Sequence, residues 1–92
     1  MNAISTSDRP VIARGLRLQW EPAQQAHVLL YPEGMIKLNS SAGEIMKRCD
    51  GKRTLTDITA DLEQAFSATG LAGDVEAFVA MALDKHWLEI QP

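Results

Sequence analysis

The side chains that most often do chemistry in proteins are sparse in this sequence. It has two histidines, His27 and His86, and a single cysteine, Cys49, and none of them is paired with another in a ligand motif. A zinc site needs several such ligands clustered at short spacing. We therefore expect structural roles, with His86 at a helix end that favours a cation and Cys49 as a small buried hydrophobe. The sequence predicts no metal site.

Catalytic motifs are also missing from the pattern. Gly70 and Gly73 have neither the strand–loop–helix setting nor the lysine of a phosphate-binding loop. Spacing pairs no nucleophile with a base. Several carboxylates fall where helix starts and exposed faces are expected, which is typical of capping and solubility: Asp57, Asp61, Glu63, Asp74 and Glu76. We expect a protein that is not an enzyme and holds no cofactor, with a small enzyme or cofactor carrier as an alternative.

Length and charge restrict the partners of the chain. Its 92 residues predict one domain, with residues 1–9 as a flexible N-terminal segment and 10–92 as the domain itself. The net charge of −3 argues against nucleic-acid binding. The apolar runs are far shorter than the ~20 residues that span a membrane, the start of the chain lacks the apolar core of a signal peptide, and one cysteine allows no internal disulfide. We expect a cytoplasmic protein.

Hydrophobic periodicity in the first half is that of strands. Leu16, Leu18 and Trp20 alternate with polar residues, and residues 26–31 are almost continuously apolar. Pro32 and Gly34 then occupy positions favoured in a tight turn, and residues 34–38 make a short third strand. Together these segments predict a three-stranded antiparallel sheet. Residues 87–90 either add a terminal strand or pack on the body.

The period becomes helical from Asn39 onward. We expect a first helix from Asn39 or Ser41 to Cys49, the latter start with a capping box to Glu44, and a second capped by Thr54 with Phe66 on its apolar face. A third helix begins after Asp74. The predicted fold class is α+β, a winged-helix-like arrangement of a three-stranded antiparallel sheet followed by a three-helix bundle.

The third strand of such a sheet has a free edge. Edge strands present unpaired main-chain N–H and C=O groups to another chain, so an extended peptide could add beside residues 34–38, against the third helix. The alternatives are that the C-terminal residues or a second subunit already cover this edge.

A winged-helix DNA-binding regulator is a second function to weigh. The third helix would then enter the major groove, but it begins Asp74-Val75-Glu76 and later carries Asp84 against one lysine, Lys85. Phosphates would repel that charge. The basic residues gather elsewhere, either as a solvated helix end or as a surface for a partner enzyme: Lys47, Arg48, Lys52 and Arg53.

An ordered set of short motifs resembles the pyrroloquinoline quinone (PQQ) biosynthesis protein D family (PqqD). The set covers roughly Arg9 to Ile90 and consists of Leu30-Tyr31-Pro32-Glu33-Gly34, Leu38-Asn39, Ser41-Ala42, Ile45, Asp50-Gly51, Thr54-Leu55-Thr56-Asp57-Ile58, Leu62, Asp74-Val75, Phe78 and Trp87-Leu88. The resemblance implies a non-catalytic peptide chaperone with a peptide-recognition domain. Such proteins bind the ribosomal precursor peptide, PqqA, and present it to the radical S-adenosylmethionine enzyme PqqE, which crosslinks a Glu and a Tyr.

The resemblance also implies the peptide site, a cleft between the third strand and the third helix. Its residues would be Gly34, Met35, Ile36, Lys37, Leu38 and Asn39 on the strand and Val75, Phe78, Met81, Ala82 and Lys85 on the helix. The apolar ones are equally explained as core, so the main chain of Met35 and Lys37 is the stronger expectation. The turn before the strand either contacts the peptide or only reverses the chain. An open edge further makes a homodimer by strand swapping possible.

Overall fold

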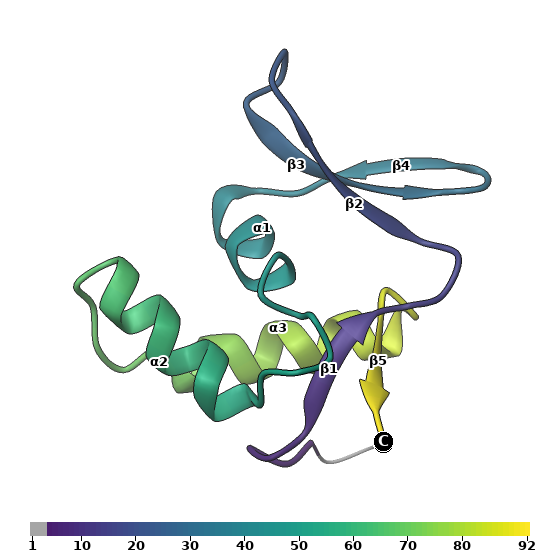
Figure 1. Cartoon of the computed structure of the whole chain (residues 1–92). Helices are drawn as coiled ribbons and strands as arrows, with labels where there is room; N and C mark the ends of the chain where they lie inside the picture. Colours follow the sequence, from purple (N-terminus) through teal and green to yellow (C-terminus); the bar gives the residue numbers. More distant parts are fainter. Residues whose placement is uncertain (1–3) are drawn as a thin grey trace.

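A computed structural model describes residues 4–92 of the chain. Its elements, in order, are β1 (Arg9–Ile12), β2 (Arg17–Glu21), β3 (Ala26–Tyr31), β4 (Gly34–Lys37), α1 (Ser40–Met46), α2 (Leu55–Ala65), α3 (Ala72–Asp84) and β5 (Leu88–Gln91). Figure 1 shows the β2–β4 sheet above the helices, with β1 and β5 side by side below it. The fold is therefore α+β, as predicted.

The strands form two sheets, which corrects the expectation of one three-stranded sheet. One sheet has the antiparallel order β2-β3-β4, and the other pairs β1 with β5. Strand β1 is short and begins with Arg9 opposite Gln91, at the other end of the sequence. A four-residue segment containing a proline carries no strand period of its own, so only its distant partner defines it. The terminal strand itself, β5, was anticipated as one of two outcomes.

The three-stranded sheet follows its alternation of apolar residues. Pairing places Leu18, Leu29 and Ile36 in one row across the strands, on the face that α1 covers. A two-residue turn, Pro32-Glu33, joins β3 to β4. Because side chains alternate between faces, this register buries the apolar row against the helices and fixes which main-chain groups of β4 face outward.

Local hydrogen bonds set the helix starts. Asn39 Oδ1 accepts from Ala42 N–H at 2.8 Å, so α1 begins at Ser40 and the expected Ser41–Glu44 capping box is wrong. The helix also ends at Met46, before Cys49. Thr54 caps α2 in a capping box with Asp57, as its spacing predicts for the cap. Helix α3 starts before Asp74, at Ala72, because Leu71 C=O already accepts from Val75 N–H.

A single apolar core joins the three helices to the β2–β4 sheet and β5. It consists of Leu29, Leu38, Ala42, Ile45, Met46, Cys49, Leu55, Ile58, Leu62, Val75, Val79, Ala82 and Leu88. Residues before β1 also touch this body, since Leu55 N–H donates to Asp8 C=O at 3.1 Å and Thr56 N–H to Thr6 C=O at 3.2 Å. Of the segment expected to be flexible, residues 1–3 lie outside the described residues.

Candidate functional site

The main chain of β4 has one side free. Leu38 N–H donates to His27 C=O at 3.0 Å, and Ile36 lies opposite Leu29 in the same register. Residues of an antiparallel strand alternate between bonding the neighbour and facing away from it. The N–H and C=O groups of Met35 and Lys37 therefore face away from β3. No other strand pairs with this edge among residues 4–92.

The side chains of the β4 segment divide between surface and core. Met35 is 53% exposed, and Lys37 is exposed beside it. Ile36 is partly buried and packs on the core, while Leu38 belongs to the core itself. Asn39 is committed to capping α1. The expected strand wall therefore offers main-chain groups and two outward side chains, whereas its apolar members serve the fold.

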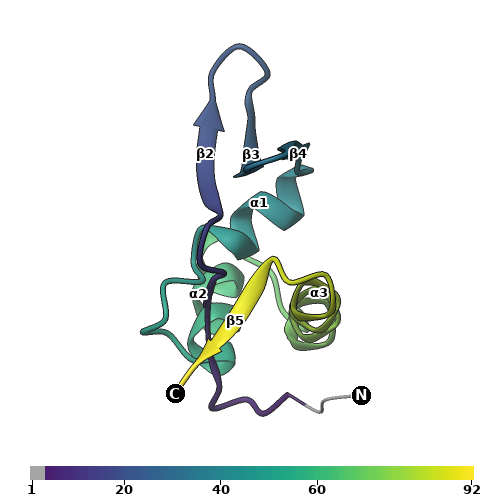
Figure 2. The same ribbon diagram turned by 90° about the vertical axis from the view of Figure 1, so that its right-hand side faces the viewer.

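The helix wall of the expected cleft divides in the same way. Val75 and Ala82 are fully packed in the core. Phe78 is partly buried against the core and Met81 is partly buried, whereas Lys85 is exposed, with its Nζ 5.9 Å from the centroid of the Trp87 ring. In both views α1 lies at a level between β4 and α3 (Figures 1 and 2). The two walls are thus separate surfaces around α1.

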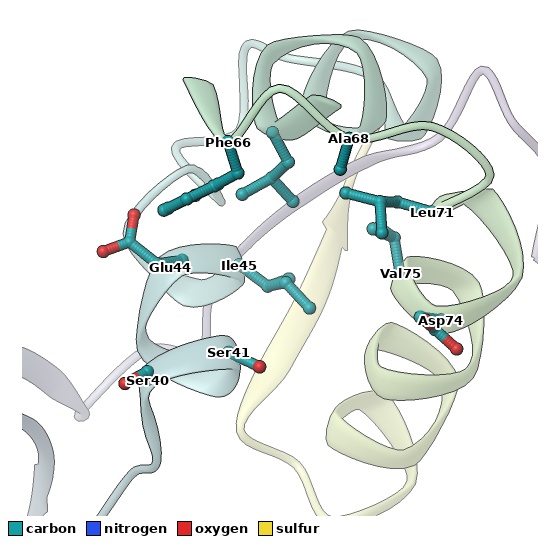
Figure 3. Close-up of a pocket in the computed structure, with 10 residues that line it drawn as sticks. Ser40, Ser41, Glu44, Ile45, Phe66, Ala68, Leu71, Asp74 and Val75 are labelled. Carbon is teal, nitrogen blue, oxygen red and sulfur yellow. The ribbon is translucent and has the colours of Figure 1, made fainter. Parts of the chain in front are cut away.

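A pocket that the sequence did not reveal lies beside α1. Its volume is about 390 Å³, and it opens between α1, the end of α2 and the start of α3 (Figure 3). Its apolar lining is Ile45, Leu62, Phe66, Leu71 and Val75, and its polar lining includes Ser40, Ser41, Glu44 and Asp74. Because Ser40 follows Lys37 by three residues, the pocket adjoins the end of β4.

Phe66 corrects a prediction at this pocket. Its spacing placed it on the buried face of α2, but it follows the last helical residue and is 55% exposed. The helical period does not hold beyond the helix end, so the side chain turns toward the pocket instead (Figure 3). Of the pocket residues, only Val75 was named as a site residue in advance; a large apolar side chain just before the Ser67–Gly70 loop was the available signal.

Comparison with known proteins identifies the family. The sequence profile of the family described as "Coenzyme PQQ synthesis protein D (PqqD)" matches residues 26–88. The chain belongs to the PqqD family. Its relatives include proteins of Stutzerimonas stutzeri, 47% identical, and Pseudomonas aeruginosa, 48% identical, both named "PqqA binding protein". Each match covers 99% of this chain and 100% of the relative. The resemblance seen in the sequence motifs is confirmed.

A solved structure of the PqqD family shares the fold. The solution structure of the PqqD truncation of Methylobacterium extorquens PqqCD matches with a TM-score of 0.73 and 34% identity, covering 95% of each chain. That protein is described as a functional, stand-alone recognition element for ribosomally synthesised and post-translationally modified peptides. The fold around β4 is therefore that of a PqqD recognition element.

In this PqqD-family chain, Arg48 fixes α1 on α2. The arginine is only 8% exposed. Its Nη1 donates to Glu44 C=O at 2.9 Å and to Glu44 Oε1 at 2.8 Å, and its Nε donates to Asp61 Oδ2. The bond from Arg48 lowers the pKa of both carboxyl groups below their ordinary values. Within the basic cluster, Arg48 is thus internal, while Lys47, Lys52 and Arg53 are exposed.

The histidine and cysteine singled out at the start take structural positions. His27 packs against α1 at Gly43 and lies edge-on to Trp20, with ring centroids 5.1 Å apart. Cys49 is buried, its Sγ donates to Ile45 C=O at 3.3 Å, and burial raises the pKa of its thiol to about 12. Residues 4–92 contain no group of three or more His, Cys, Asp or Glu placed to hold a metal. Within the same range, every helix is too short or too polar to cross a membrane.

Proposed function

We propose that this protein binds the precursor peptide PqqA as an added strand along the free edge of β4 and presents it to the radical S-adenosylmethionine enzyme PqqE. It catalyses no step itself. The relatives named "PqqA binding protein" support the ligand. The observation that carries the mode of binding is the outward direction of the main-chain groups of Met35 and Lys37, which follows from the β3–β4 register.

The energy that this edge offers suits reversible capture. Two residues provide two N–H donors and two C=O acceptors, each hydrogen bond worth about 1 kcal/mol net. An apolar side chain of the guest that enters the pocket beside α1 adds about 1.5–3 kcal/mol. Together with the exposed surfaces of Met35 and Phe78, these terms approach the roughly −8 kcal/mol of a micromolar complex. Lys37 favours an acidic residue in the guest.

Presentation to PqqE needs no further chemistry from this chain. A chaperone that holds the peptide and also contacts the enzyme raises the local concentration of the peptide at the active site. The exposed Lys47, Lys52 and Arg53 are candidates for that second contact. Duplex binding in winged-helix fashion gains no support, because the exposed start of α3 carries Asp74. Cytoplasmic location and dimerisation by strand swapping remain predictions.

The deciding experiment removes one main-chain donor. Lys37→Pro deletes the outward N–H and places a ring where the guest strand would lie. Lys37→Ala is the matched control, because it removes only the side chain. We expect calorimetric titration with PqqA to show more than tenfold weaker binding for Lys37→Pro and at most a few-fold change for Lys37→Ala. Amide NMR should place the largest shifts of the wild-type protein at residues 35–37.

A folded Lys37→Pro variant that binds PqqA as tightly as wild type would refute strand addition at β4. Circular dichroism checks that the variant is folded. Presentation is tested separately, by the rate at which PqqE crosslinks PqqA with and without the chaperone. Lys37→Ala should support that rate and Lys37→Pro should not; equal rates for both would show that the captured peptide is not the one delivered.

A further inference from the structure

The β2–β4 sheet has a second free edge, along β2. Because Leu29 bonds toward β4, the alternation in β3 directs the main-chain groups of Val28 and Leu30 toward β2. Their partners are Gln19 and Arg17. The residues of β2 whose N–H and C=O groups face outward are therefore Leu18 and Trp20. Within the described part of the chain, Figure 2 shows no helix or strand along this outer side of β2.

Trp20 makes this edge unusually apolar. It is 51% exposed, although it lies in the same row as His27 on the face that α1 covers. A large aromatic side chain at an open strand edge is typical of a surface that another chain covers, because aromatic residues carry much of the energy of protein interfaces. An occupant of this edge should thus offer an apolar side chain opposite Trp20.

The sequence of β2 is complementary to itself when two copies run antiparallel. The strand reads Arg17-Leu18-Gln19-Trp20-Glu21. If two copies meet with Gln19 opposite Gln19, Arg17 of each lies opposite Glu21 of the other, and Leu18 lies opposite Trp20. Opposite charges in facing positions stabilise an antiparallel pair, and like charges destabilise it.

The same register also satisfies the main chain. It pairs Leu18 of one copy with Trp20 of the other, twice, and these are the two residues whose N–H and C=O groups face outward. Two such pairs form four hydrogen bonds. Shifting by one pair in either direction brings Arg17 or Glu21 opposite Gln19 and loses both charge pairs. Charge and hydrogen bonding therefore select one and the same alignment.

We infer that β2 is the site at which a second copy of this chain binds. The two-fold pairing of β2 strands joins both sheets into one continuous six-stranded sheet, an isologous contact in which no segment is exchanged. The edge of β4 does not serve this purpose, since it carries Lys37 and no acidic residue. The inference is independent of the proposed peptide binding, which uses the opposite edge.

Charge reversal tests the pairing without touching the core. Arg17→Glu brings two glutamates face to face, at the substituted position and Glu21, and Glu21→Arg likewise brings an arginine opposite Arg17. Sedimentation velocity over a concentration series should show self-association of the wild type and at least tenfold weaker association of each variant. Mixing the two variants in equal amounts restores opposite charges across the contact, as does the double variant, so both samples should recover the dimer. Lys37→Glu, on the other edge, is the control and should leave association unchanged.

Hydrogen exchange gives the second measurement. The amides of Leu18 and Trp20 should become protected as the wild-type protein is concentrated, while those of Met35 and Lys37 stay unprotected. A wild-type protein that remains monomeric at millimolar concentration would overturn the inference. So would a dimer that survives in both single variants, or one whose concentration-dependent protection lies at β4. Peptide titrations of the same variants report on β4 separately.

Discussion

At the scale of single residues, Arg48 carries the main polar contact between α1 and α2. The guanidinium is buried and bonds Glu44 on its own helix and Asp61 on α2, whereas Lys47 and Arg53 reach solvent. Residue type could not separate these basic side chains in advance. Only the packing of α2 places a carboxylate next to Arg48, so the sequence indicates a basic cluster without indicating which member is internal.

Arg48→Met should therefore make stability less dependent on pH in the acid range. Bonding to Arg48 lowers the folded-state pKa of Glu44 and Asp61, so the stabilisation is complete above the ordinary carboxyl pKa of about 4 and is lost as the pH falls through the lowered values. At pH 7 we expect a loss of about 1 kcal/mol, since both carboxylates are partly exposed and screened.

Urea denaturation at pH 7 and at pH 3 measures this difference. The gap in unfolding free energy between wild type and Arg48→Met should narrow on acidification. Arg53→Met is the control, because that side chain makes only long ion pairs, at 3.8 and 3.9 Å, and should change stability little at either pH. A gap that stays constant with pH would mean that Arg48 acts through packing alone.

At the scale of elements, α1 and β3 are in contact through a glycine. A Cβ on Gly43 would lie 2.8 Å from His27 Nδ1 and 3.3 Å from His27 Cβ. The helix could not then approach β3 as closely, and β4 follows β3 directly. The sequence pattern marks Gly43 only as a weak helix former, because nothing local reveals that a histidine from a preceding strand packs on it.

Two glycine-to-alanine variants separate helix propensity from packing. Gly43→Ala should destabilise the protein by about 1–3 kcal/mol, the usual effect of overpacking. Gly73→Ala, in the first turn of α3 with no atom near its added Cβ, should instead stabilise by up to about 1 kcal/mol. Thermal unfolding compares them, and a His27→Ala background should remove most of the penalty at Gly43. Stabilisation by Gly43→Ala in the wild-type background would contradict the contact.

Elements with a clear period were predictable, and those defined by distant partners were not. The alternation of Leu18 and Trp20 and the apolar run of β3 identify the sheet, and Thr54 fixes the start of α2. Strand β1 escapes because its partner is β5, at the far end of the chain. The same limit holds at the candidate site: the register gives the edge groups of β4, but the pocket forms only when the ends of α2 and α3 meet α1.

At the scale of the whole molecule, the β2–β4 sheet has two edges of different chemistry. The β2 edge carries one charge of each sign, spaced to match a second copy, and the β4 edge carries a lysine and an exposed methionine. Strand β3 separates them, and α1 covers the apolar face between. A chain that left either edge open would be at risk of unselective strand pairing, so distinct partners on the two edges also limit aggregation.

Occupation of both edges predicts a complex of two chains and two peptides. PqqA adds outside β4 in each copy, which extends the six-stranded sheet to eight strands without contact between the two guests. Because β3 lies between the edges, we expect peptide affinity to be equal, within about twofold, for the wild-type dimer and for the monomeric Arg17→Glu variant. Sedimentation of the protein with fluorescent PqqA should give the mass of a two-to-two complex for wild type and a one-to-one complex for the variant. Peptide that dissociates the wild-type dimer would instead place both partners on the same edge.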